Sequence, residues 1–351
     1  MNARPLLPLL LLLLAAPAPA QEPGPSGFAG LGAAAEGFAI PERGHDLRFP
    51  EDHGPHPLFR IEWWYLTANL EGPDGTPHGV QWTLFRTALR PTGLPEDQVW
   101  MGHAAVTRPG AHRAAERLAL GGTGQAGVVA EPFAAWIDEW RLEGDLDGPG
   151  GATVTAQGPD WAYDLRLLAT GPVVLQGDRG YSVKSPEGQA SHYYSLPFLA
   201  AEGTLLLPEG EVAVTGTAWI DREWSSQPLS PDQTGWDWFS LSFETGEKMM
   251  GFRLNARDGS RFTAATWIAP DGTPTPFPDG AFDAEPLGWT EVAGRRVPTR
   301  WRVTLPERGL DATVAAVEPA AWMPLSVPYW EGPVTVEGSH RGRGYLEMTG
   351  Y

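Results

Sequence analysis

Short segments of alternating apolar and polar residues recur along the chain, and turn-forming residues separate them. Strict alternation is typical of a β-strand, because successive side chains point to opposite faces. No long segment of this chain has the period of a helix. Turn signals such as Pro73-Asp74-Gly75 and Pro270-Asp271-Gly272 lie where hairpins need them. The sequence therefore predicts an all-β protein. The clearest alternating segments span residues 62–70, 80–86, 100–107, 134–142, 152–157 and 161–169.

The N-terminus has the three-part build of a secretory signal peptide. A basic residue, Arg4, precedes an apolar run from Leu6 to Ala16, and small residues follow up to Ala20. We expect cleavage after Ala20, which predicts a periplasmic or secreted protein. The apolar run is too short to span a bilayer comfortably. Residues 21–44 are rich in Gly, Ala and Pro, and we expect them to form a flexible arm.

Composition narrows the class of partner. Acidic residues outnumber basic ones 43 to 25, so nucleic acid and anionic lipid are poor partners. The chain has no cysteine, which excludes disulfides, thiolate metal sites and a lipid anchor on a thiol. Sixteen tryptophans favour a site for an apolar ligand, although core packing accounts for most of them.

A weak internal repeat predicts two related β units. The segment from Trp63 to Leu70 is echoed by the segment from Asp237 to Phe243, and a strand with Phe-Arg follows each. Chance similarity between aromatic-rich strands is the alternative. Two units joined near Ser230-Pro231-Asp232 would explain the repeat. We therefore expect an N-terminal domain at residues 45–230 and a C-terminal domain at residues 231–351.

Two short segments carry most of the chemistry. His192 and Tyr194 lie two residues apart, as do Trp219 and Asp221, so the members of each pair share one face if both segments are strands. An imidazole, a carboxylate and two rings could then converge. The alternative is that these side chains merely form part of a barrel wall.

Other motifs carry less weight. Gly122 to Gly127 fits the dinucleotide pattern GxGxxG, but no alternating βα pattern surrounds it, and we interpret it as a turn. His45-Asp46 and the segment from Asp52 to His56 hold potential metal ligands at loose spacing, and a structural corner is the favoured interpretation. Glu62 is either catalytic or a hydrogen-bond acceptor, with Arg86 as its partner. We predict no metal and no cofactor.

Six motifs in the same order resemble the AttH and carotenoid 1,2-hydratase family of lipocalin-like proteins. The resemblance covers the chain from about His45 to Tyr351. It implies two consecutive lipocalin-like β-barrel domains. The motifs are Phe49-Pro50-Glu51-Asp52-His53-Gly54, Glu62-Trp63-Trp64-Tyr65, Gly180-Tyr181-Ser182-Val183-Lys184, Ser191-His192-Tyr193-Tyr194-Ser195, Trp219-Ile220-Asp221-Arg222-Glu223-Trp224 and Gly235-Trp236-Asp237-Trp238-Phe239.

The hydratase branch of this family implies cofactor-free addition of water to an isolated carbon–carbon double bond. A carboxylic acid protonates the alkene, aromatic faces stabilise the cation, and a base-activated water captures it. The family's His-x-Trp and Tyr-x-Asp pairs fall on His192 with Tyr194 and on Trp219 with Asp221, with the two ring types exchanged. The resemblance implies that Asp221 is the acid, His192 the base, and Tyr194 and Trp219 the walls.

Further aromatic residues of these motifs are candidates for ligand contact. They are Trp63, Trp64, Tyr65, Tyr193, Trp224 and Trp236.

A second hypothesis is a non-catalytic binding protein. The exported AttH branch is associated with ABC-type export systems, so such a protein would pass an apolar ligand to or from a membrane transporter. Both hypotheses expect a monomer with an elongated apolar ligand. They differ at Asp221, since an enzyme needs this carboxyl partly buried with a raised pKa, whereas a carrier tolerates Asn there.

Overall fold

The computed structural model describes residues 31, 33 and 35–351. Of these residues, 60% lie in strands and 3% in short helices, so the all-β prediction is confirmed. The expected signal peptide, residues 1–20, lies outside the described residues, as do residues 21–30, 32 and 34 of the expected arm. No helix in the described part combines the length and apolar character that a membrane span requires. The helices are η2 (Glu51–His53), η3 (Pro95–Asp97) and η4 (Pro306–Arg308).

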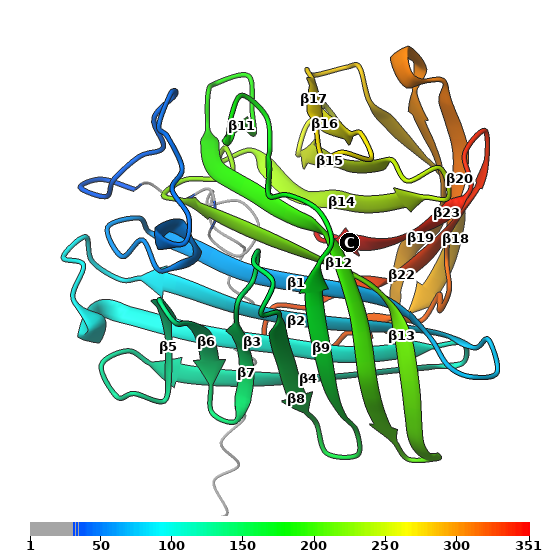
Figure 1. Ribbon diagram of the computed structural model, residues 1–351. Helices are drawn as coiled ribbons and strands as arrows, with labels where there is room; N and C mark the ends of the chain where they lie inside the picture. The colour runs from blue at the N-terminus through cyan, green and yellow to red at the C-terminus, as the bar shows by residue number, and fades with distance from the viewer. Residues whose placement is uncertain (1–30, 32, 34) are drawn as a thin grey trace, which may run out of the picture.

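The first sheet has 13 strands and curls into a nearly closed barrel (Figure 1). Its path runs β4 (Ala111–Leu120), β3 (Gln98–Arg108), β2 (Pro77–Ala88), β1 (Ile61–Glu71), β13 (Gly210–Ser225), β12 (Ala190–Leu207), β9 (Ala162–Ala169), β8 (Ala152–Gln157), β7 (Trp140–Gly144), β6 (Phe133–Ile137) and β5 (Ala126–Ala130). Two short strands, β10 (Val174–Leu175) and β11 (Tyr181–Val183), pair with β12. The curl brings β6 against β2, β3 and β4.

The second sheet has 10 strands and forms a half-barrel. Its path runs β17 (Pro274–Phe277), β16 (Arg261–Ile268), β15 (Lys248–Ala256), β14 (Gln233–Phe243), β23 (Gly342–Met348), β22 (Tyr329–Gly338), β20 (Leu310–Ala316), β19 (Arg295–Leu305) and β18 (Asp283–Val292), and β21 (Trp322–Met323) pairs with β22. The chain changes sheet between Ser225 and Gln233, and the domain boundary that we expect at residue 230 falls in this connection.

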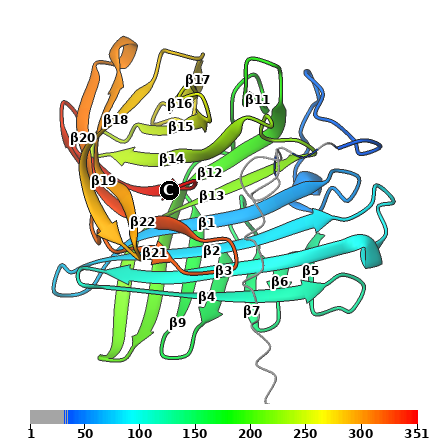
Figure 2. The same cartoon turned by 180° about the vertical axis from the view of Figure 1, so that it is seen from behind.

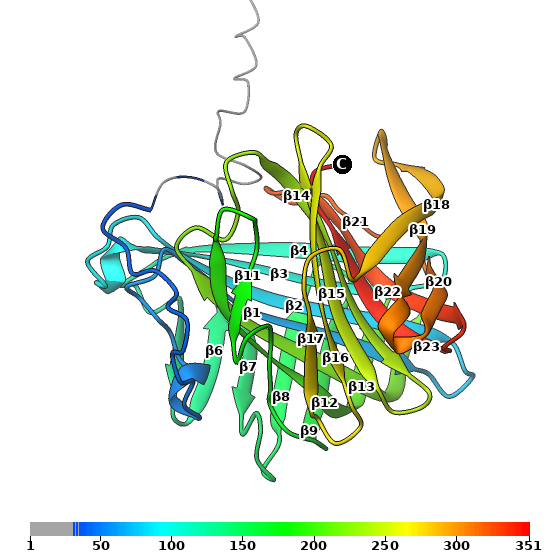
Figure 3. The same ribbon diagram turned by 90° about the horizontal axis from the view of Figure 1, so that it is seen from above.

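The two sheets lie against each other, with β23 beside β1 and β22 beside β2 (Figures 2 and 3). Each sheet has a core on its other face. The core of the first contains Trp64 and Trp82, and that of the second contains Trp301. A third apolar cluster, which includes Tyr193 and Trp238, fills part of the space between the sheets. Both faces of β1 are therefore covered.

The internal repeat has a structural counterpart. In β1 and β2, Glu62 lies opposite Arg86 and accepts a hydrogen bond from its Nε at 3.0 Å. In β14 and β15, Asp237 lies opposite Arg253 and accepts a hydrogen bond from its Nε at 2.9 Å. The residues that follow these carboxylates turn to the opposite face, toward the other sheet. The two repeat copies thus present their aromatic residues to each other across the interface.

Candidate functional site between the two sheets

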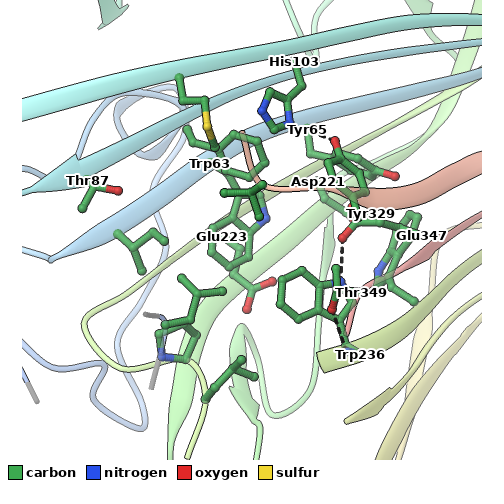
Figure 4. A pocket seen from close by; sticks show the side chains of 18 of the residues that line it. Trp63, Tyr65, Thr87, His103, Asp221, Glu223, Trp236, Tyr329, Glu347 and Thr349 are labelled. Atoms are coloured by element: carbon green, nitrogen blue, oxygen red, sulfur yellow. Dashed lines mark hydrogen bonds between the residues drawn. The ribbon is translucent and has the colours of Figure 1, made fainter. Parts of the chain in front are cut away.

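A cavity of about 390 Å³ lies between the two sheets. Its walls are mainly apolar and aromatic, and its polar groups come from strands of both sheets (Figure 4). Such a cavity is typical of a small-molecule site. Key lining residues are Trp63, Tyr65, Tyr193, Asp221, Trp238 and Glu347.

Strand register decides which side chains reach the cavity. In the pairing of β1 with β13, Tyr65 lies opposite Asp221 and Trp63 opposite Glu223. Directly opposed residues of an antiparallel pair share one face, so all four side chains point toward the second sheet. Trp64 points to the opposite face and belongs to the core of the first barrel.

Asp221 is a fully buried carboxyl group with three hydrogen-bond donors. Its Oδ1 accepts hydrogen bonds from the Trp219 Nε1, at 2.7 Å, and from the Ser195 hydroxyl. Its Oδ2 accepts one from the Tyr193 hydroxyl at 2.7 Å. Burial raises the pKa of Asp221 to about 7 against the opposing effect of these donors. A large fraction of this carboxyl is therefore protonated at neutral pH.

A contact across the interface holds Tyr193 in place. The indole Nε1 of Trp238, on β14, donates a hydrogen bond to the Tyr193 hydroxyl oxygen at 3.1 Å. This oxygen accepts from Trp238, so its own proton is directed to Asp221. The second sheet thereby orients a donor to a carboxyl group of the first sheet.

The second sheet contributes a second carboxyl group to the cavity wall. Glu347 on β23 accepts a hydrogen bond from the Trp236 Nε1 at 2.6 Å. Burial, together with the negative charges of Asp221 and Glu223, raises the pKa of Glu347 to about 7. A neighbouring carboxyl, Glu331, lies opposite Glu347 on β22.

Glu331 forms part of a buried hydrogen-bonded chain. The Tyr65 hydroxyl donates to Glu331, and burial raises the pKa of this carboxyl well above its ordinary value. Tyr329 also hydrogen-bonds Glu331, and its hydroxyl lies 3.0 Å from the His103 Nδ1. The other ring nitrogen of His103 lies 3.2 Å from Glu116. Both nitrogens of His103 are thus engaged.

One ion pair sits in the cavity wall. Lys184 Nζ lies 2.8 Å from Glu223 Oε1, and the ammonium also lies over the rings of Tyr193 and Phe252. Glu223 thus has a cationic partner, whereas among the described residues no ion pair is formed by Asp221 or Glu347.

The structure does not bring the four predicted catalytic side chains together. Trp219 and Asp221 share the face toward the second sheet, and His192 and Tyr194 share a face, as the period of two predicts within each strand. The register of β12 with β13 places Ser195, not Tyr194, opposite Asp221. His192 and Tyr194 therefore point to the opposite side of the sheet, and the expectation that all four face one cavity is wrong.

His192 and Tyr194 instead belong to an aromatic cluster on the barrel side. The His192 ring lies 4.7 Å from His45 and 5.5 Å from Trp224, and burial lowers its pKa to about 4. The Tyr194 hydroxyl lies 2.6 Å from the His53 Nδ1. A base at His192 cannot act on a water beside Asp221, because the sheet lies between them.

The predicted ligand-contact residues also divide between the cavity and the barrel side of the first sheet. Trp63, Tyr65, Tyr193 and Trp236 line the cavity. Trp64 and Trp224 are buried on the barrel side and do not line this cavity. Trp219 belongs to the apolar cluster between the sheets and reaches the site through its hydrogen bond to Asp221.

The potential metal ligands near the N-terminus form an ion-pair network. His56 Nδ1 lies 2.7 Å from Glu62 Oε1, and His56 Nε2 lies 3.1 Å from Asp52 Oδ1. Glu62 also binds Arg86, as the sequence suggested, and Arg222. Within the part of the chain that the structure describes, no group of three or more potential ligands has a metal-binding arrangement.

Several cavity residues were not predicted from the sequence. Glu347 and His103 are isolated polar residues in strands, and no motif or spacing marks them. Lys184 and Glu223 lie within the quoted motifs, and the spacing of two from Asp221 to Glu223 was a signal that could have placed Glu223 on the same face. Trp238 could have been predicted, because it follows Asp237 in the internal repeat just as Trp63 follows Glu62.

The model of the AttH-like family matches residues 40–351. The chain belongs to the AttH-like family. A solved structure described as AttH from Nitrosomonas europaea is 33% identical and superposes with a TM-score of 0.81, covering 90% of this chain and 99% of that one. No curated protein matches the sequence.

The fold extends to a more distant solved structure. Kievitone hydratase from Nectria haematococca is 15% identical, has a TM-score of 0.66, and aligns over 89% of this chain and 98% of its own. At this identity the likeness concerns the fold. With the AttH structure, it agrees with the expected architecture of two lipocalin-like domains.

Proposed function

We propose that this member of the AttH-like family binds an elongated apolar ligand between its two sheets and adds water to a carbon–carbon double bond of that ligand. The observation that carries this proposal is Asp221, a buried carboxyl with a pKa of about 7 in an apolar cavity. A group with this pKa can donate a proton at neutral pH. A hydratase of the same fold also supports the reaction class.

The cavity suits a reaction through a carbocation. Asp221 would protonate one alkene carbon and leave the positive charge on its neighbour. The rings of Trp63, Tyr65 and Trp238 line the same space, and their negative faces would stabilise that charge. Apolar walls would keep bulk water away from the cation, so that one positioned water captures it.

Transport of an apolar ligand is the second candidate function. The mainly apolar lining of the cavity favours it, because binding alone requires only volume and apolar area. Under this hypothesis an ABC-type transporter is the partner. Under both hypotheses the protein is exported to the periplasm or secreted, a proposal that the signal-like N-terminus supports. Under both it acts as a monomer.

The test begins with the ligand. The protein is purified without denaturation. Bound lipids and isoprenoids are then extracted from it and identified by mass spectrometry. Wild type and Asp221→Asn are then incubated in H₂¹⁸O with that compound, or with an acyclic polyene. An enzyme incorporates one ¹⁸O per product, and Asp221→Asn loses about 10² to 10⁴ in rate while its affinity for the ligand stays nearly constant.

A different result would favour transport. If wild type binds the compound with no incorporation of ¹⁸O, or if Asp221→Asn is as fast as wild type, then Asp221 is a structural carboxyl and the hydratase proposal is wrong.

A further inference from the structure

Addition of water requires a base as well as an acid, and the base must face the same cavity. His192 does not face it, as shown above. We propose that Glu347 is the second reacting carboxyl: it pairs with Asp221 across the interface of the two sheets, accepts the proton of the attacking water and returns it to Asp221. This inference rests on the proposed hydratase function.

The geometry supports Glu347 because it reaches the cavity from the sheet opposite Asp221. Glu347 lies opposite Trp238 on β14, and Trp238 contacts Tyr193, the donor to Asp221. Both carboxyls line one cavity, Asp221 from β13 of the first sheet and Glu347 from β23 of the second (Figure 4). An acid and a base that come from two different sheets and line one cavity can act on the two ends of one double bond.

The other polar groups of the cavity are already engaged. Glu223 is held by Lys184 at 2.8 Å. His103 contacts Tyr329 and Glu116 through its two ring nitrogens. Glu347, by contrast, has no Lys or Arg among the groups that shift its pKa. It is therefore the cavity group best able to change its protonation state during a reaction.

The two carboxyls are coupled through their charges. The negative charge of Asp221 raises the pKa of Glu347, and both values lie at about 7. When one of two such groups ionises, the other holds its proton more tightly. Near neutral pH the pair therefore favours a single shared proton, which is the state that an acid and a base require.

Hydrogen bonds fix which oxygen of each group reacts. The Oδ1 of Asp221 accepts from Trp219 and Ser195, while Oδ2 accepts from Tyr193 alone, so the acidic proton belongs on Oδ2. The Oε1 of Glu347 accepts from the Trp236 indole. Oε2 of Glu347 is then the oxygen available to a water.

The reaction balances with these two groups. The Asp221 Oδ2–H bond breaks as the alkene π pair forms a new C–H bond, which leaves a carbocation and the Asp221 carboxylate. The water oxygen forms the C–O bond, and one of its protons moves to Glu347 Oε2. Transfer of that proton from Glu347 to Asp221 restores the starting state, and no other reactant is consumed.

Other titratable groups face Glu347 and belong in any interpretation of its pH dependence. They are Glu223 on β13, Glu331 and Tyr329 on β22, Tyr65 on β1, Tyr193 on β12, His103 on β3 and Lys184 after β11. The tyrosines remain neutral, since burial raises the pKa of Tyr65, Tyr193 and Tyr329 further above 10. Lys184 and Glu223 form an ion pair, and the negative charge of Glu223 still contributes to the raised pKa of Glu347.

The test uses Glu347→Gln in the full chain, with Glu337→Gln, an exposed residue of β22, as the matched control. The rate of ¹⁸O incorporation is measured from pH 5 to pH 9. Wild type and control should give a bell-shaped profile, because Asp221 must be protonated and Glu347 ionised. Glu347→Gln should lose about 10² or more in rate at neutral pH and lose the decline at low pH.

A second measurement does not depend on turnover. Carboxyl carbons are labelled with ¹³C and titrated by NMR. Asp221 should titrate in two steps in wild type and in one step in Glu347→Gln, since the coupled partner is gone. If Glu347→Gln does not fold, Trp236→Phe replaces it. Removal of the indole donor raises the pKa of Glu347, so the decline at low pH moves to higher pH.

The outcomes separate the two proposals. If Glu347→Gln keeps the full rate and profile while Asp221→Asn is inactive, the hydratase function stands and the role of Glu347 is wrong. If Asp221 titrates identically in wild type and Glu347→Gln, the pairing is wrong. If wild type hydrates nothing that it binds, the proposed function fails and the base role fails with it.

Discussion

The indole nitrogen of Trp238 lies 3.1 Å from the hydroxyl oxygen of Tyr193, and that hydroxyl donates to Asp221 at 2.7 Å. Trp238 belongs to the second sheet, and the other two residues belong to the first. The orientation and pKa of the central carboxyl therefore depend on the packing of the two sheets. Neither sheet alone would present the same site.

Replacement of Tyr193 by Phe should shift the titration of Asp221 upward. The Tyr193 hydrogen bond stabilises the Asp221 carboxylate and lowers its pKa, so loss of this bond raises the pKa from its value of about 7. In an enzyme, the decline in rate at alkaline pH then moves to higher pH. Tyr163→Phe is the control, because the hydroxyl of Tyr163 is also buried but donates to the carbonyl of Gln81. An unchanged titration in Tyr193→Phe would contradict this account.

Asp221→Asn should stabilise the protein at alkaline pH. The pKa of Asp221 rises from 3.8 in the unfolded chain to about 7 in the fold, so the fold binds this proton more tightly. The associated stability is complete below pH 4 and is lost as pH rises toward and through 7. The total is on the order of 4 kcal/mol. Urea unfolding at pH 5 and pH 8.5 should show the variant gaining more on wild type at the higher pH.

Substitution of Trp63 should mainly reduce ligand affinity, whereas substitution of its neighbour Trp64 should mainly reduce stability. Trp63→Ala removes a cavity wall and should weaken ligand binding by about 2 kcal/mol, or roughly 30-fold, with a small effect on stability. Trp64→Ala leaves a void in the barrel core and should reduce the free energy of unfolding by about 3–5 kcal/mol. Fluorescence titration with the co-purified compound and thermal melts measure both effects. Equal loss of affinity in the two variants would contradict the assignment of faces.

Glu62→Gln should destabilise the first barrel strongly. The Glu62 carboxylate contacts Arg86 and Arg222 at 3.0 and 2.8 Å, and all three side chains are buried. Loss of the charge leaves two buried guanidinium groups uncompensated, at a cost of about 3–5 kcal/mol. Glu71→Gln, which breaks an exposed pair with Arg343, should cost less than about 1 kcal/mol. Differential scanning calorimetry compares the variants, and equal melting temperatures would count against the network.

The same network accounts for acid sensitivity. The charges of His56, Arg222 and Arg86 outweigh burial and hold the pKa of Glu62 far below its ordinary value. The stability from this group is present above its unfolded value of 4.5 and is lost as pH falls below it. Wild type should therefore lose stability below about pH 4.5 more steeply than Glu62→Gln.

The sequence determined the strand pattern, the family and the local facing of each motif. Alternation is a property of a single strand, so the shared face of Trp219 with Asp221, and of His192 with Tyr194, could be inferred from a spacing of two. The partner of Glu62 could be inferred because Arg86 lies on the neighbouring strand of a hairpin. These relationships involve residues that are close in sequence or joined by a short turn.

Only the tertiary structure decided which faces meet. A shift of one residue in the register of β12 with β13 would move His192 to the side of Asp221, and the pattern within either strand does not specify that register. Glu347 lies 126 positions after Asp221, and it reaches the same cavity through the packing of one sheet on another. Such contacts arise from burial of whole sheet faces, because apolar area drives the packing without regard to sequence separation.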